Sequence, residues 1–211
     1  MVALALHTTA VSAGHIAASR AAASWQWYVI RASGFTAAGL LMLLMLSGIG
    51  QVTGLTYKVL EPIKAWALHK AMALALCGAI AVHATFLVLD HFVPFTLPQV
   101  LVPFLSHYTN GTKFLGVGLG GMAVALGILA MYGVVVVVLS SLGWIETKKG
   151  AWRWLHYLSY FVFFAVFVHA LGVGSDLKYG TFRNVWIAIG AVVLLAVISR
   201  VRRAGTLKHK D

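Results

Sequence analysis

Five long apolar runs constrain the fold of this chain more than any other feature of its sequence. They lie near residues 28–50, 63–90, 113–142, 152–173 and 182–201. Each is long enough for an α-helix to cross the hydrocarbon core of a bilayer, which takes about 20 residues. Of the 211 residues, 61% are hydrophobic and only 10% are charged, whereas a soluble domain has about 25% charged residues. The sequence therefore predicts an all-α integral membrane bundle of about five transmembrane helices, with residues 26–203 as its domain.

The segments outside these runs are polar or rich in Pro and Gly. Residues 1–25 are Ala-rich but carry several polar and charged side chains, so we expect an N-terminal tail, loosely ordered or interfacial, rather than a sixth span. Residues 204–211 form a basic C-terminal tail. Three prolines in the segment 92–112 argue against a regular span and favour a short interfacial helix that caps the outer side.

The basic residues predict the orientation in the membrane. The formal net charge is +11 at pH 7, which in a soluble protein would suggest nucleic acid as a partner. Here 11 of the 16 Lys and Arg residues fall in the segments 58–70, 148–153 and 200–210, which five spans place on one face. Because the face richer in Lys and Arg is cytoplasmic, we expect a multi-pass protein of the cell (inner) membrane. We expect the N-terminus outside and the C-terminus in the cytoplasm. We also expect the lipid bilayer as a partner, and no binding of nucleic acid.

Two pairs of histidines lie inside two of the apolar runs. His69 and His83 are fourteen positions apart, and His156 and His169 are thirteen positions apart. An ionisable side chain inside a span is costly and marks a functional site by default. At about 1.5 Å of rise per residue, each pair spans roughly 20 Å, about two thirds of the hydrocarbon core. The two runs are separated by one span, so their helices run parallel. We therefore expect His69 to face His156 on the inner side and His83 to face His169 on the outer side.

Metal centres held by paired histidines are the functional interpretation of this pattern. Two imidazoles on opposite sides of a haem iron give a six-coordinate centre that passes electrons and binds no substrate at the iron. A spacing of thirteen positions misses the starting helix face by roughly 140°, so the second pair needs a bulge, a bend or reach from flanking positions. Two alternatives stay open. The four histidines could each be hydrogen-bonded to a neighbouring helix, or they could contribute to a zinc site, for which neither a Cys pair nor clustered carboxylates are present.

The fourth run carries the segment Trp152-Arg-Trp-Leu-His156-Tyr-Leu-Ser-Tyr-Phe-Val-Phe-Phe-Ala-Val-Phe-Val-His169-Ala-Leu-Gly-Val-Gly-Ser-Asp176. This segment resembles the ferric reductase-like transmembrane domain. That family includes ferric-chelate reductases, the membrane part of NADPH oxidases and the haem subunit of a bacterial methionine sulfoxide reductase system. In the family, two helices one span apart carry paired histidines at these two unequal spacings. The resemblance covers about residues 28–201 and is strongest in the second and fourth runs.

The resemblance implies two haem b groups, the inner one between His69 and His156 and the outer one between His83 and His169. It also implies that Arg31 lies beside the propionates of the outer haem, although an arginine that snorkels to the lipid headgroups is an equal alternative. Arg153, three positions before His156, is close enough in the sequence to reach an inner propionate. Family members often have six spans. No bound flavin is expected, because the sequence ends about ten residues after the last run.

The expected function is therefore that of a membrane di-haem b cytochrome, an oxidoreductase subunit for transmembrane electron transfer. Its electron donor would be a cytoplasmic flavoprotein or quinol, and its acceptor would be a molecule or partner protein at the outer face. No catalytic residue is assigned. The alternative is a non-redox membrane scaffold or small transporter, whose histidines are structural or relay protons.

Overall fold

A computed structural model describes residues 25–208 of the chain, apart from positions 92, 110–112, 115–116, 119 and 178. Its elements in chain order are α2 (Trp25–Thr53), η1 (Thr56–Lys58), α3 (Pro62–Leu89), α4 (Leu97–Leu101), β1 (Lys113–Phe114), β2 (Val117–Gly118), α5 (Gly120–Trp144), α6 (Lys149–Val173), η2 (Ser175–Leu177) and α7 (Thr181–Lys208). The expected N-terminal tail lies outside the described residues, except for Trp25, which begins α2. The expected C-terminal tail is helical as far as Lys208, where α7 ends.

Five helices are long and apolar enough to cross a membrane: α2, α3, α5, α6 and the segment Thr181–Arg200 of α7. This confirms the all-α bundle of five apolar helices. Large apolar side chains remain exposed on the outward faces, among them Leu43, Leu139 and Leu195. In water such a surface would be unfavourable, whereas helices that are apolar on all sides are those of membrane spans. The chain is therefore a multi-pass membrane protein.

The third span is shorter than its apolar run, and the expected helix over 113–142 was wrong at its start. Helix α5 begins only at Gly120, after β1 and β2, which pair antiparallel with Lys113 opposite Gly118. Residues 116, 118, 120 and 121 are all glycine, and each glycine costs about 1 kcal/mol in a helix interior relative to Ala. Gly120 also packs against the carbonyl group of Tyr108, where a Cβ atom would not fit.

Local signals explain where other helices begin and end. Helix α3 begins with Pro62, whose missing N–H is no loss in the first turn. Helix α2 ends before Gly54, which has a φ of +78° that favours glycine. The short helix expected in the segment 92–112 is α4, and the Gln99 side chain stabilises its first turn by accepting a hydrogen bond of 3.0 Å from the Thr96 N–H.

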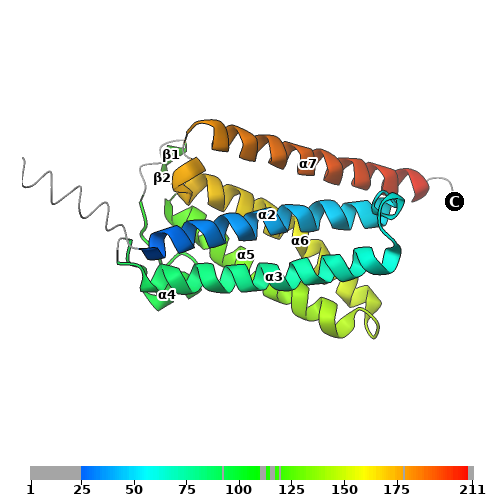
Figure 1. The fold of residues 1–211 in the computed structure, drawn as a ribbon, viewed down its shortest axis with the longest axis horizontal. Helices are drawn as coiled ribbons and strands as arrows, with labels where there is room; N and C mark the ends of the chain where they lie inside the picture. Colours follow the sequence, from blue (N-terminus) through cyan, green and yellow to red (C-terminus); the bar gives the residue numbers. More distant parts are fainter. Residues whose placement is uncertain are drawn as a thin grey trace, which may run out of the picture.

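Two antiparallel helical hairpins build the bundle, one of α2 with α3 and one of α5 with α6 (Figure 1). The helices of each hairpin pack more extensively against each other than against the other hairpin. Helix α7 packs against α2. Helix α4 and the strands lie at the end of the bundle where α2 begins, and α7 ends at the opposite end (Figure 1). We call these the outer end and the inner end, following the orientation that the basic residues predict.

A cluster of buried apolar side chains fills the middle of the bundle. Its members come from both hairpins: Leu41, Leu44, Leu76, Ala130, Val134, Val162 and Ala165. Small residues here let helices approach closely, which favours association in membranes. Two cavities lie on either side of this cluster along the bundle axis, and Leu41, Leu76 and Val134 line both of them. The interior is thus closed in the middle and hollow toward both ends.

Candidate bis-histidine sites

The inner cavity holds His69 of α3 and His156 of α6. Their ring centroids are 6.5 Å apart, and the ring planes are inclined by 45°. A metal bound at about 2 Å by two imidazole nitrogens on opposite sides would separate the ring centroids by about 6 Å. The two rings are therefore at the separation that one metal ion between them requires. The cavity has a volume of about 780 Å³, within the range of about 300–1,000 Å³ that is usual for ligand sites.

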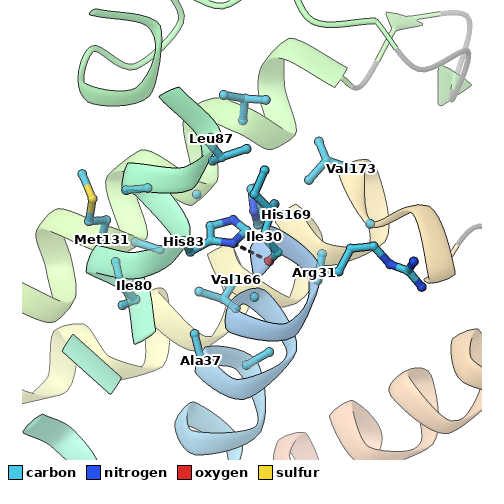
Figure 2. A pocket seen from close by; sticks show the side chains of 18 of the residues that line it. Ile30, Arg31, Ala37, Ile80, His83, Leu87, Met131, Val166, His169 and Val173 are labelled. Atoms are coloured by element: carbon cyan, nitrogen blue, oxygen red, sulfur yellow. Dashed lines mark hydrogen bonds between the residues drawn. The ribbon is translucent and has the colours of Figure 1, made fainter. Parts of the chain in front are cut away.

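The outer cavity holds His83 of α3 and His169 of α6. Figure 2 shows the two side chains close together, with Ile80, Leu87 and Val166 around them. This cavity has a volume of about 240 Å³, which lies below the usual range for ligand sites. A macrocycle would fit there only if the lining side chains moved apart. The structure thus brings the four histidines together in the two pairs that the order of the spans predicts.

Every hydrogen bond that the four rings form within the described part of the chain goes through Nδ1. The outer rings use backbone carbonyls: His83 donates to the Ile30 oxygen over 2.9 Å, and His169 donates to the Ala123 oxygen over 2.8 Å. A carbonyl only accepts, so in a neutral imidazole the proton is assigned to Nδ1 and the lone pair to Nε2.

The inner rings use hydroxyl groups. The Nδ1 of His69 lies 2.8 Å from the Ser47 hydroxyl, and the Nδ1 of His156 lies 3.5 Å from the Ser141 hydroxyl. Each serine donates its own proton to a backbone carbonyl one turn earlier and so accepts from the imidazole. Metal-binding histidines typically donate their other N–H to an acceptor in this way, which orients the ring and leaves the second nitrogen for the metal.

Glycines lie beside three of the four rings, and a Cβ atom would be too close at Gly127, tight at Gly34 and in ordinary contact at Gly48. A Cβ atom at Gly127 would lie 2.5 Å from the Nδ1 of His169, one at Gly34 would lie 3.1 Å from the Cε1 of His83, and one at Gly48 would lie 3.5 Å from the Cε1 of His69. These glycines lie on α2 and α5, the helices that precede the histidine helices. Their role was not predicted from the sequence. The signal that points to it is the interval from Gly34 to Gly48, which equals that from His69 to His83.

The unequal spacing on α6 is not explained by a bulge. Helix α6 is α-helical from Lys149 to Val173, without a π-turn. His156 and His169 nevertheless line the inner and the outer cavity, respectively. A bend of the helix, or ligands that reach from flanking positions, would still account for the spacing.

Arg31, which lines the outer cavity, is held in an ion pair. Its guanidinium forms a two-point ion pair with Asp176 of η2, over 2.8 Å from Nε and 2.5 Å from Nη2. Figure 2 shows the Arg31 side chain pointing away from both histidine rings. The ion pair neutralises the charge, so a propionate near Arg31 would have to share the guanidinium with Asp176.

Three basic side chains line the inner cavity instead, together with one acidic side chain, Glu146. Arg153, Lys70 and Arg200 all line it, and none of the three forms an ion pair with a described carboxylate. The guanidinium of Arg200 lies 5.7 Å and 5.5 Å from the ring centroids of Tyr157 and Tyr160. In the sequence Arg200 served only as an orientation signal. Its position makes it a second candidate, beside Arg153, for an anionic group bound in the inner cavity.

The remaining polar candidates lie elsewhere. His91 and His107 are exposed, as expected for loop residues, and His7, His15 and His209 lie outside the described residues. Burial raises the pKa of Tyr108, whose side chain lines the outer cavity outside the spans. Among the described residues, no group of three or more His, Cys, Asp or Glu side chains converges as a metal site. The described residues therefore do not supply the four ligands of a structural zinc site.

Comparisons of the chain with models of known protein families, with curated proteins and with solved structures found no match in any of the three. The resemblance of the segment 152–176 to the ferric reductase-like domain thus remains an expectation. The function is therefore inferred from the geometry of the two histidine pairs.

Proposed function

We propose that this chain is a membrane di-haem b cytochrome subunit that carries electrons from a cytoplasmic-side donor to an acceptor at the outer face. One observation supports this more than any other: His69 and His156 lie 6.5 Å apart, ring centroid to ring centroid, across a cavity of about 780 Å³. The Nδ1 of His69 is hydrogen-bonded to Ser47 over 2.8 Å, and the Nδ1 of His156 lies 3.5 Å from the Ser141 hydroxyl, so each ring has its other nitrogen available for a metal.

The residues of the inner cavity fit a haem in three respects. His69 and His156 would bind the iron, and Arg153 and Arg200 would bind the propionate carboxylates through charge-assisted hydrogen bonds. The apolar cluster in the middle of the bundle would cover the inward edge and exclude water. Haem iron with two histidine ligands supplies one-electron transfer without an open coordination position.

The outer pair would hold the second haem through His83 and His169, and its smaller cavity would have to widen. Two centres at different depths would together bridge most of the hydrocarbon core. The basic inner loops favour an acidic donor surface, such as a flavoprotein, by electrostatic steering. Quinol from the bilayer is the other donor class, and the acceptor at the outer face could be ferric chelate, oxygen or a partner enzyme.

The test is a measurement of haem content and spectrum in the purified protein. We expect two haems per chain and a reduced-minus-oxidised spectrum of low-spin haem. His69→Ala and His83→Ala should each remove about one haem, while the exposed His91→Ala is the matched control and should keep both. A well-folded wild-type protein without haem would refute the proposal and favour the non-redox scaffold or transporter with hydrogen-bonded histidines.

A further inference from the structure

Helix α2 carries the dipeptide Ser-Gly twice, at Ser33-Gly34 and at Ser47-Gly48. The two copies are fourteen positions apart, as are the two histidines of the antiparallel helix α3. This interval returns to within roughly 40° of the same helix face, so both copies can face α3. In the structure a Cβ atom added at Gly34 would lie 3.1 Å from the Cε1 of His83, and one added at Gly48 would lie 3.5 Å from the Cε1 of His69. Each histidine ring of α3 thus lies beside one Ser-Gly dipeptide of α2. We call Ser33-Gly34 the outer step and Ser47-Gly48 the inner step.

The two steps differ in which group accepts the proton of the imidazole. At the outer step the Nδ1 of His83 lies 2.9 Å from the Ile30 carbonyl oxygen, and the Ser33 hydroxyl is farther away, at 3.5 Å. Ser33 donates its own proton to the carbonyls of Val29 and Ile30. His83 therefore has a backbone acceptor that no side-chain substitution removes.

At the inner step a hydroxyl stands between the histidine and the backbone. The Nδ1 of His69 lies 2.8 Å from the Ser47 oxygen, and Ser47 in turn donates to the Leu44 carbonyl over 3.1 Å. Leu44 is the counterpart of Ile30, one such interval farther along α2. His69 has no other hydrogen-bond acceptor among the described residues. Its orientation therefore depends on one side-chain oxygen.

We propose that Ser47 is a positioning residue for His69, and that Ser33, at the equivalent place, has no such role for His83. The inference rests on the proposed function, since it concerns how His69 binds iron. A hydrogen bond from Nδ1 fixes the ring orientation and makes the imidazole a stronger donor to the metal. The loss of the acceptor should weaken the ligand and favour the reduced, less positive iron. The Ser47 hydroxyl would thus hold the inner centre in place and lower its reduction potential.

The experiment compares Ser47→Ala, Ser47→Thr and Ser33→Ala in the full-length chain purified with haem. Loss of the group that accepts a ligand's hydrogen bond typically costs about 10- to 100-fold in metal affinity. We expect Ser47→Ala to lose haem from one site at least about tenfold more readily than wild type. The potential of that centre should also rise, and a tenfold difference between the oxidation states corresponds to about 59 mV for one electron.

Two variants make the result specific. Ser47→Thr keeps a hydroxyl that can still donate to the preceding turn and should behave as wild type. Ser33→Ala should keep both haems and both potentials, because His83 retains the Ile30 carbonyl. Circular dichroism and gel filtration in detergent check that all three variants fold equally well.

The outcomes separate the inference from the proposed function. Equal haem loss and unchanged potentials in Ser47→Ala and Ser33→Ala would overturn the inference while leaving the proposed function intact. A wild-type protein that binds no haem would overturn the proposed function and this inference with it.

Discussion

Substitution of single glycines by alanine along the bundle should produce a graded effect that follows the space beside each glycine. Among the glycines beside the histidine rings, the one with the least space is Gly127: in Gly127→Ala the Cβ would lie 2.5 Å from the Nδ1 and 2.6 Å from the Cε1 of His169. These distances are about 1 Å inside normal van der Waals contact, which is about 3.5–4.0 Å. The ring cannot move away without losing the 2.8 Å hydrogen bond from its Nδ1 to the Ala123 carbonyl.

The magnitude follows from opposing contributions. Alanine is preferred to glycine in a helix interior by about 1 kcal/mol, and nothing lies within 4 Å of a Cβ at Gly78. Gly78→Ala should therefore stabilise the protein slightly. At Gly127 the overpacking costs about 1–3 kcal/mol, and the weakened hydrogen bond costs about 1 kcal/mol more. The net destabilisation of Gly127→Ala should be about 1–3 kcal/mol. Gly34→Ala should be close to neutral, because its nearest contact would be 3.1 Å.

The assay is thermal unfolding in detergent, combined with the haem content of each variant. Gly127→Ala should unfold at the lowest temperature and lose the outer haem, Gly34→Ala should resemble wild type, and Gly78→Ala should unfold at the same or a higher temperature. The reasoning is refuted if Gly127→Ala is as stable as Gly78→Ala and keeps both haems.

Two further predictions concern contacts that tie separate parts of the chain together. Removing either charge of the ion pair, by Arg31→Gln or Asp176→Asn, should destabilise the protein by about 1–2 kcal/mol, because the remaining charge is only partly exposed. A double-mutant cycle measured by thermal unfolding should give a coupling energy of about 1 kcal/mol between the two residues. Additive effects of the two substitutions would contradict the pairing. Trp186→Ala should lower the free energy of unfolding by about 3 kcal/mol, because the indole is buried and stacks on Phe167 at 5.8 Å between ring centroids. Trp186→Phe keeps the stacking and should recover most of this stability. An alanine variant as stable as wild type would show that other contacts hold α7.

The order of the spans led to the pairing of His69 with His156 and of His83 with His169. The number of spans between the two helices is enough for that prediction. Because exactly one span separates them, the two helices point in the same direction, and residues at matching depths meet if the helices are neighbours. The start of α5 was not predictable from hydropathy alone. Glycine is counted as apolar in such a run, while its low helix propensity decides where the helix begins.

The partners of the charged residues were also beyond the reach of the sequence. Arg31 meets Asp176, 145 positions away, and Arg200 lies over Tyr157 and Tyr160. Such contacts depend on how far each helix is rotated about its axis and shifted along it. The rotation and the shift of each helix cannot be predicted from the local sequence, because a helix that is apolar on all sides has no face whose composition marks it as buried.

The sequence by itself determined that the chain has five membrane-spanning segments, since partition into lipid depends on apolar content summed over about 20 residues. It also determined how far apart the two histidines of one helix lie along its axis, because the rise per residue of an α-helix is constant. Only the tertiary structure decided which glycines lie beside the histidine rings, which oxygen accepts each Nδ1 proton and where the cavities lie. Those features arise from packing between helices, where a shift of about 1 Å separates a hydrogen bond from a clash.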